Sequence, residues 1–296
     1  MFKRATPRRG PHPHAIAYTL SAPALLLFVT MVLVPLLLTG LLSLNSYDDS
    51  VGIKAGVDLH NYLAIFGDEY YLRIFLRTFW IAALTTLICV LVGAPEAYVL
   101  SRMRGRWRSL FLIVILAPLL VSVVVRAFGW SMLLSADGLI NHALQAMGIA
   151  PVKMLYTSGA IVVALVHVML PFMVIPVWTA LQRLDPQTEY AALSLGASPF
   201  TTLRRIVVPQ LMPGVLSGSL MVFGLSASAF AIPGLLGGRR LKVAATAVYD
   251  EFLGSLNWPL GATIAVLLLV ANLVVMLTYY RVLERRYARS LGGASR

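Results

Sequence analysis

The stretch EYAALSLGASPFTTLRRIVVP, from Glu189 to Pro209, places an acidic residue, an alanine pair and a glycine between two long apolar segments. Pro186 suits the first turn of a helix, and good helix formers follow it. Gly196 stands where a helix ends in a left-handed residue, and Ser198-Pro199 can cap and start a second helix. A short helix can dock in a groove of another protein through apolar side chains three and four residues apart. The chemistry predicted here is therefore protein docking.

The predicted docking residues lie on the two short helices and at the glycine between them. Tyr190, Leu193 and Ala191 are the expected apolar anchors. The alternative is an ordinary loop at a membrane surface. The full predicted docking set is Glu189, Tyr190, Ala191, Ala192, Leu193, Gly196, Ser198 and Pro199.

Some polar and aromatic residues elsewhere are candidates for a translocation pathway. An arginine inside an apolar segment is costly and indicates function, although it can also lie near a helix end and snorkel. Aromatic side chains near segment ends suit either a membrane-interface belt or cation–π contact with an amine. The candidates are Arg126, Trp130, Asp137, Tyr249 and Trp258.

The remaining side chains show no enzyme site. The sequence has no G-x-x-x-x-G-K-[ST] phosphate loop, and its single cysteine, Cys89, lies in an apolar run. Glu96, near the end of an apolar segment, is expected either to pair with Arg102 or to line a cavity. We expect this chain to hold no cofactor or metal and to catalyse no reaction by itself.

These candidates must be positioned by membrane-spanning helices. The chain has 296 residues, of which 59% are hydrophobic and 12% charged, whereas charged residues make up about 25% of a soluble domain. A helix of about 20 apolar residues crosses the hydrocarbon core, and no alternating strand pattern is present. The sequence predicts an all-α membrane protein whose six spans are Ala15–Ser43, Ile74–Leu100, Leu110–Leu134, Ser158–Leu181, Val207–Pro233 and Gly261–Leu283.

The charges predict the orientation. The net charge is +12, but lysine and arginine gather in short clusters between apolar segments, which argues against nucleic-acid binding. The positive-inside rule places both termini and the 185–209 loop in the cytoplasm. The basic run at 237–242 is an exception, because it falls outside. The predicted organisation is a cytoplasmic tail at 1–14, a transmembrane domain at 15–283 with its coupling loop at 185–209, and a cytoplasmic tail at 284–296.

The Glu189–Pro209 stretch resembles the E-A-A-x3-G-x9-I-x-L-P loop of type I ABC importer permeases. Ala191, Ala192, Gly196, Ile206 and Pro209 match this pattern at its spacing. Tyr190 stands at the usual glutamate position, with Glu189 one place earlier, and Val208 replaces the usual leucine. Four further stretches are similar to the PotB-like spermidine/putrescine subfamily: LSADGLINHALQAMGI (134–149), LPFMVIPVW (170–178), LMPGVLSGSL (211–220) and NWPLGAT (257–263).

The resemblance implies a MetI-like fold with a cytoplasmic coupling helix, in a multi-pass protein of the bacterial inner membrane. It implies a permease subunit of an ATP-driven importer for polyamines or a related small amine. The implied partners are an ABC ATPase dimer that binds ATP and Mg, a second homologous permease, a periplasmic solute-binding protein and membrane lipid. The alternatives are an importer for another small solute, such as an amino-acid-like compound or a phosphonate, and an ion-coupled carrier or channel without an ATPase.

Overall fold

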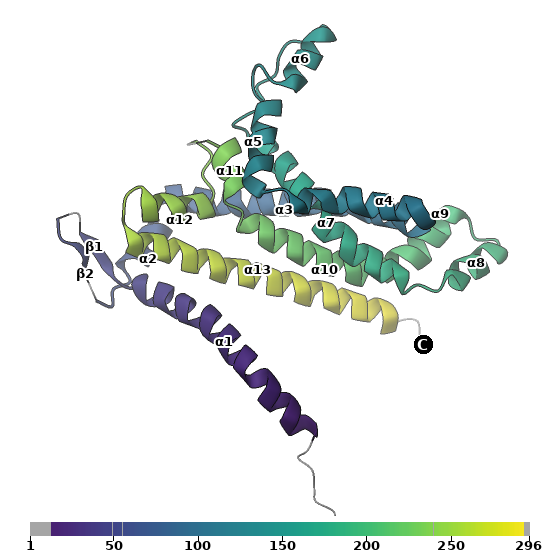
Figure 1. Ribbon diagram of the computed structural model, residues 1–296, viewed down its shortest axis with the longest axis horizontal. Coiled ribbons are helices and arrows are strands. Elements are labelled where there is room, and N and C mark those ends of the chain that lie inside the picture. Colours follow the sequence, from purple (N-terminus) through teal and green to yellow (C-terminus); the bar gives the residue numbers. More distant parts are fainter. Residues whose placement is uncertain (1–12, 49, 55, 239, 293–296) are drawn as a thin grey trace, which may run out of the picture.

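The computed structural model describes residues 13–48, 50–54, 56–238 and 240–292, in which long helices form a bundle (Figure 1). Shorter helices and one hairpin lie around it. The long helices are α1 (Pro13–Leu42), α3 (Glu69–Arg102), α7 (Ser158–Gln182), α10 (Val208–Ala227) and α13 (Trp258–Gly292). The other elements are β1 (Ser46–Asp48), β2 (Gly52–Lys54), α2 (His60–Gly67), α4 (Gly105–Leu116), η1 (Ala117–Leu120), α5 (Val123–Leu133), α6 (Leu139–Ala146), α8 (Pro186–Ser194), α9 (Pro199–Thr202), the π-helical turn η2 (Leu203–Val207), α11 (Ala231–Leu236) and α12 (Ala244–Leu253).

Helices α3, α7 and α10 pack closely at the centre because small residues let their backbones approach. Gly214 and Gly218 lie one turn apart on α10 and face α7. A Cβ atom on Gly214 would lie 2.7 Å from the carbonyl oxygen of Pro176. Met173 of α7 fills the space beside Gly218 and also beside Gly93 of α3, where a Cβ atom would lie 2.9 Å from the Met173 Cγ. These glycines therefore set the spacing of the three central helices.

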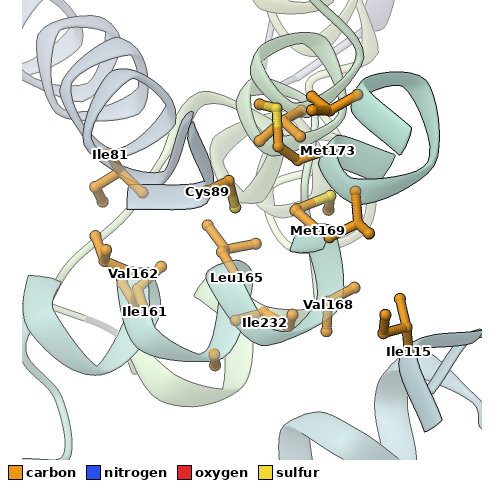
Figure 2. Close-up of a cluster of buried hydrophobic side chains, with 14 of the residues drawn as sticks. Ile81, Cys89, Ile115, Ile161, Val162, Leu165, Val168, Met169, Met173 and Ile232 are labelled. Carbon is orange, nitrogen blue, oxygen red and sulfur yellow. The ribbon is translucent and has the colours of Figure 1, made fainter. Parts of the chain in front are cut away.

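The main hydrophobic core lies along α7. Figure 2 shows Leu165 of this helix beside Cys89 of α3 and Val162 beside Ile81, with Ile232 of α11 close to Leu165. All five side chains are buried. The cysteine acts as a small packing residue in this core. Since α7 is apolar around its whole circumference, it occupies the middle of the bundle rather than its surface.

The third predicted span is broken, which corrects the expectation of one helix over Leu110–Leu134. The helical segment Gly105–Leu120 and α5 meet at an angle of 97°. The chain turns at Val121, whose backbone is extended, after a 3-10 turn that contains Pro118. Pro118 has no N–H to continue an α-helical ladder. As a result, α5 and α6 project away from the bundle in Figure 1.

Two other boundaries differ from the prediction. The fifth span ends at Ala227, and Pro233 belongs to the separate helix α11. The last helix starts at Trp258 and continues to Gly292, through most of the segment predicted as a tail. The N-terminal tail was predicted over 1–14. Residues 1–12 and 293–296 lie outside the described residues, as do Asp49, Ala55 and Arg239.

Helix α1 leaves the bundle, and none of its apolar stretch within Ser21–Leu42 is buried. Its C-terminal end is fixed by hydrogen bonds. The Ser43 carbonyl oxygen accepts one from the Thr263 hydroxyl of α13 at 3.1 Å, and the hydroxyls of Ser43 and Tyr62 lie 2.7 Å apart. The antiparallel hairpin β1–β2 follows, with Tyr47 opposite Ile53. The sequence analysis did not anticipate this hairpin.

Candidate functional site

The 185–209 loop has the predicted helix–glycine–helix form. The Asp185 carboxylate caps α8 by accepting a hydrogen bond from the Gln187 N–H at 2.9 Å. Gly196 ends this helix with φ at +85°, a left-handed conformation that glycine adopts without strain. The Ser198 hydroxyl caps α9 by accepting from the Thr201 N–H at 3.2 Å. The chain then enters α10 through the π-helical turn η2.

Apolar side chains of this element face solvent. Tyr190 is 60% exposed and Leu193 is 43% exposed. Leu195 and Phe200 are still more exposed, at 88% and 69%. Leu195 and Phe200 were not among the predicted docking residues. Apolar residues on both sides of a helix-ending glycine could have indicated them. Exposed apolar patches of this kind mark interaction sites.

The other predicted docking residues have different surroundings. Ala191, Ser198 and Pro199 are exposed, whereas Ala192 and Glu189 are partly buried. The structure thus gathers the whole predicted set on one short element at one end of the bundle (Figure 1). Its role in docking stays a prediction.

An ion pair joins this element to the end of α3. The Arg102 guanidinium contacts the Glu189 carboxylate, and the guanidinium carbon lies 5.1 Å from the centre of the Tyr98 ring. The Glu189 side chain is only 17% exposed. Arg102 therefore pairs with Glu189 rather than with Glu96, which corrects one of the two expectations for Glu96. The pair connects α8 to a helix of the central core.

A cavity of about 780 Å³ lies at the opposite end of the bundle, beside α5, α11 and α12. The Lys242 ammonium in its wall lies 2.8 Å from the Asp250 carboxylate, and this hydrogen bond raises the pKa of Lys242. The Glu251 carboxylate accepts a hydrogen bond from its neighbour Ser255 at 2.5 Å. These groups give the cavity two carboxylates and one ammonium among its described lining residues.

The residues predicted for a translocation pathway do not form one cluster. Tyr249 lines the cavity, with its ring centre 4.7 Å from that of Phe230. Trp130 of α5 donates from its indole nitrogen to Nδ1 of His167 at 3.3 Å. Asp137 is exposed in the turn between α5 and α6, and Trp258 is half-exposed at the start of α13.

Arg126 lies on α5, after the break in the third span. Its Nε and Nη1 atoms are buried, and within the described part of the chain they have no hydrogen-bond partner. An unpaired buried guanidinium is costly. Its role in a translocation pathway stays a prediction.

Comparison with known proteins identifies the family. Residues 16–289 match the family described as "Binding-protein-dependent transport system inner membrane component". The chain belongs to this family. The permease is 31% identical over 255 residues to the spermidine/putrescine transport system permease protein PotB of Haemophilus influenzae. This match covers 86% of this chain and 89% of that relative. The PotB protein of Escherichia coli strain K12 is 30% identical over 255 residues, covering 86% of this chain and 92% of its own.

A solved structure has the same fold. The permease matches a chain from the crystal structure of a bacterial ABC transporter involved in the import of the acidic polysaccharide alginate, with a TM-score of 0.77. The match covers 92% of this permease and 96% of that chain at 18% identity, so it shows the fold alone. With the family match, these findings make the chain a multi-pass inner-membrane permease subunit of an ABC importer. ATP hydrolysis belongs to a separate subunit.

Proposed function

We propose that this permease imports spermidine, putrescine or a closely related polyamine. The observation that carries the proposal is the 31% identity to a spermidine/putrescine permease across 86% of the chain. The cavity beside α12 supports it, because carboxylates and aromatic rings suit an organic cation. Asp250, Glu251, Phe230 and Tyr249 are the groups of this kind in its lining.

The α8–α9 element is the proposed docking site for an ABC ATPase dimer, which would hold ATP and Mg. Its exposed apolar residues Tyr190, Leu193, Leu195 and Phe200 suit a groove in that partner. The Arg102–Glu189 pair links this surface to α3, so that movement of the ATPase would be passed to the central helices. Substrate would then cross by alternating access.

The remaining partners follow from the two ends of the molecule and from α1. A second, homologous permease would cover the apolar surface of α1 that this chain leaves exposed, and lipid would surround the pair. A periplasmic solute-binding protein would dock at the end that holds α12, opposite α8. A periplasmic protein is bound in the crystal structure of a bacterial alginate ABC transporter, whose permease fold is similar.

The same arrangement supports cytoplasmic termini. The first turn of α1 and the last turn of α13 point toward the end of the bundle that holds α8 and α9 (Figure 1). If the ATPase docks there, both chain ends lie in the cytoplasm. Lys242 and the rest of the 237–242 basic run then lie on the periplasmic side.

Uptake by the assembled importer tests the proposal. The permease would be produced with its second permease and ATPase, reconstituted in liposomes and supplied with its solute-binding protein. We expect spermidine to stimulate ATP hydrolysis and to accumulate inside. Uptake by this chain alone, driven by an ion gradient, would favour a secondary carrier. ATP-driven uptake of another solute, with no response to spermidine or putrescine, would identify a different importer.

The ion pair at α8 gives a separate prediction. Arg102→Ala and Glu189→Gln should each lower substrate-stimulated ATPase activity by up to about fivefold, which corresponds to the upper value of about 1 kcal/mol for exposed ion pairs. The charge-reversed double variant, Arg102→Glu with Glu189→Arg, should recover most of this loss. A reversed pair that is no more active than the single variants would show that the contact does not matter for coupling.

A further inference from the structure

The cavity beside α12 contains a cation of the chain itself. The Lys242 ammonium lies 2.8 Å from the Asp250 carboxylate, and both residues line the cavity. Lys242 ends in a primary ammonium on a four-carbon alkyl chain. The end of a polyamine has the same chemistry, a primary ammonium on an alkyl chain. Asp250 is therefore seen in contact with a group that resembles one end of the proposed substrate.

The backbone around Lys242 is fixed, although its side chain is not enclosed. Arg77 of α3 donates from Nη1 to the Lys242 carbonyl oxygen at 3.0 Å. The Ala244 N–H donates to the Thr78 hydroxyl at 2.8 Å. The side chains of Lys242 and Asp250 are 31% and 46% exposed. A lysine with an anchored backbone and a half-solvated ion pair can exchange its partner without any change in the fold.

The charges around Lys242 favour one direction of exchange. On one side, the cavity offers Asp250 and Glu251. On the other side, Lys242 shares a smaller pocket with one tyrosine and three arginines: Tyr70, Arg73, Arg77 and Arg240. The arginines repel an incoming ammonium from this pocket. They also oppose entry of the displaced lysine, which the Tyr70 hydroxyl partly offsets by accepting a hydrogen bond. An incoming ammonium is thus directed to the carboxylate side.

We propose that Asp250 binds a terminal primary ammonium of the polyamine, and that Lys242 occupies this carboxylate until the substrate displaces it. The Phe230 and Tyr249 rings, 4.7 Å apart, lie along the same cavity for the alkyl chain and the next ammonium. This inference rests on the proposed polyamine substrate. In this arrangement Lys242 competes with the substrate for Asp250, which weakens substrate binding and so favours substrate release.

Equilibrium binding of radiolabelled spermidine tests the inference, with the complete permease–ATPase complex in nanodiscs and without the binding protein. Lys242→Met removes the competing ammonium and should tighten binding about two- to fivefold, the range of a partly exposed ion pair. Asp250→Asn should weaken binding by up to about fivefold. Lys242→Met should have no further effect in the Asp250→Asn background. Asp250→Glu keeps the charge and should bind nearly as the wild type does.

Lys54→Met is the matched control, because Lys54 pairs with Asp48 at 2.5 Å on the β1–β2 hairpin, outside the cavity. It should leave binding unchanged. If Lys242→Met binds spermidine no more tightly than the wild type while wild-type uptake is intact, the inference is overturned and the proposed function stands. If the wild-type complex neither transports nor binds spermidine, the proposed function itself fails.

Discussion

Replacing Gly196 with valine is expected to abolish substrate-stimulated ATP hydrolysis and uptake in the assembled importer. Gly196 has φ at +85°, and no atom of the described residues lies within 4 Å of the position where a Cβ would be placed. The effect therefore comes from the backbone and not from a clash. A β-branched residue at positive φ costs about 1–3 kcal/mol, and the turn can relieve this strain by changing the angle between α8 and α9. The α8–α9 element would lose its shape.

Gly196→Asn provides the control for this experiment. Asparagine tolerates the left-handed conformation better than other residues do, so this variant should keep most of the coupling. Both variants should insert in the membrane and assemble, since the altered turn lies outside the bundle core. Full activity of the valine variant would show that the geometry of this turn is unimportant.

Replacing Gly214 with valine should prevent the bundle from packing. A Cβ at this position would lie 2.7 Å from the Pro176 carbonyl oxygen and 2.8 Å from the Ala180 Cβ. Neither atom is the end of a flexible side chain, so α7 and α10 must move apart. Overpacking of this kind costs about 1–3 kcal/mol or more. We expect a low yield of monodisperse protein and a large fall in the Tm measured in detergent.

Gly40→Val is the matched control for Gly214. Gly40 also lies inside a long apolar helix, α1, but a Cβ there has no neighbour within 4 Å among the described residues. The same change in helix propensity should then leave the Tm of the isolated permease nearly unchanged. If the Tm decreased equally in both variants, the loss of stability would come from the lower helix propensity of valine and not from close packing at Gly214.

The sequence predicted the spans by length and hydropathy, and this worked where a span is one straight helix. It failed at Val121, because a count of apolar residues cannot distinguish a bent segment from a continuous one. The positions of the prolines did not predict which span is broken. Helices α1, α3 and α7 continue through Pro35, Pro95 and Pro171, whereas Pro118 is followed by a sharp break. Packing of neighbouring helices decides between these outcomes.

The local part of the candidate site was predictable and the long-range part was not. Asp185, Gly196 and Ser198 each act through backbone contacts within a few residues, so their types and spacing sufficed. Arg102 and Glu189 are 87 residues apart in the chain, and their pairing requires the fold. For this reason the sequence offered only the nearby Glu96 as a possible partner of Arg102, beside the alternative that Glu96 lines a cavity. The Lys242–Asp250 pair was also missed, because its importance depends on a cavity that three helices form only in the folded protein.

The docking of the ATPase on α8–α9 is tested most directly by photo-crosslinking in the assembled importer. A photoreactive amino acid would replace Leu195, which is 88% exposed beside Gly196, or Leu139, which is 69% exposed on α6 and projects from the bundle elsewhere. We predict that position 195 crosslinks to the ATPase subunit and that position 139 does not. An ATPase crosslink from position 139, with none from position 195, would contradict the proposed coupling site.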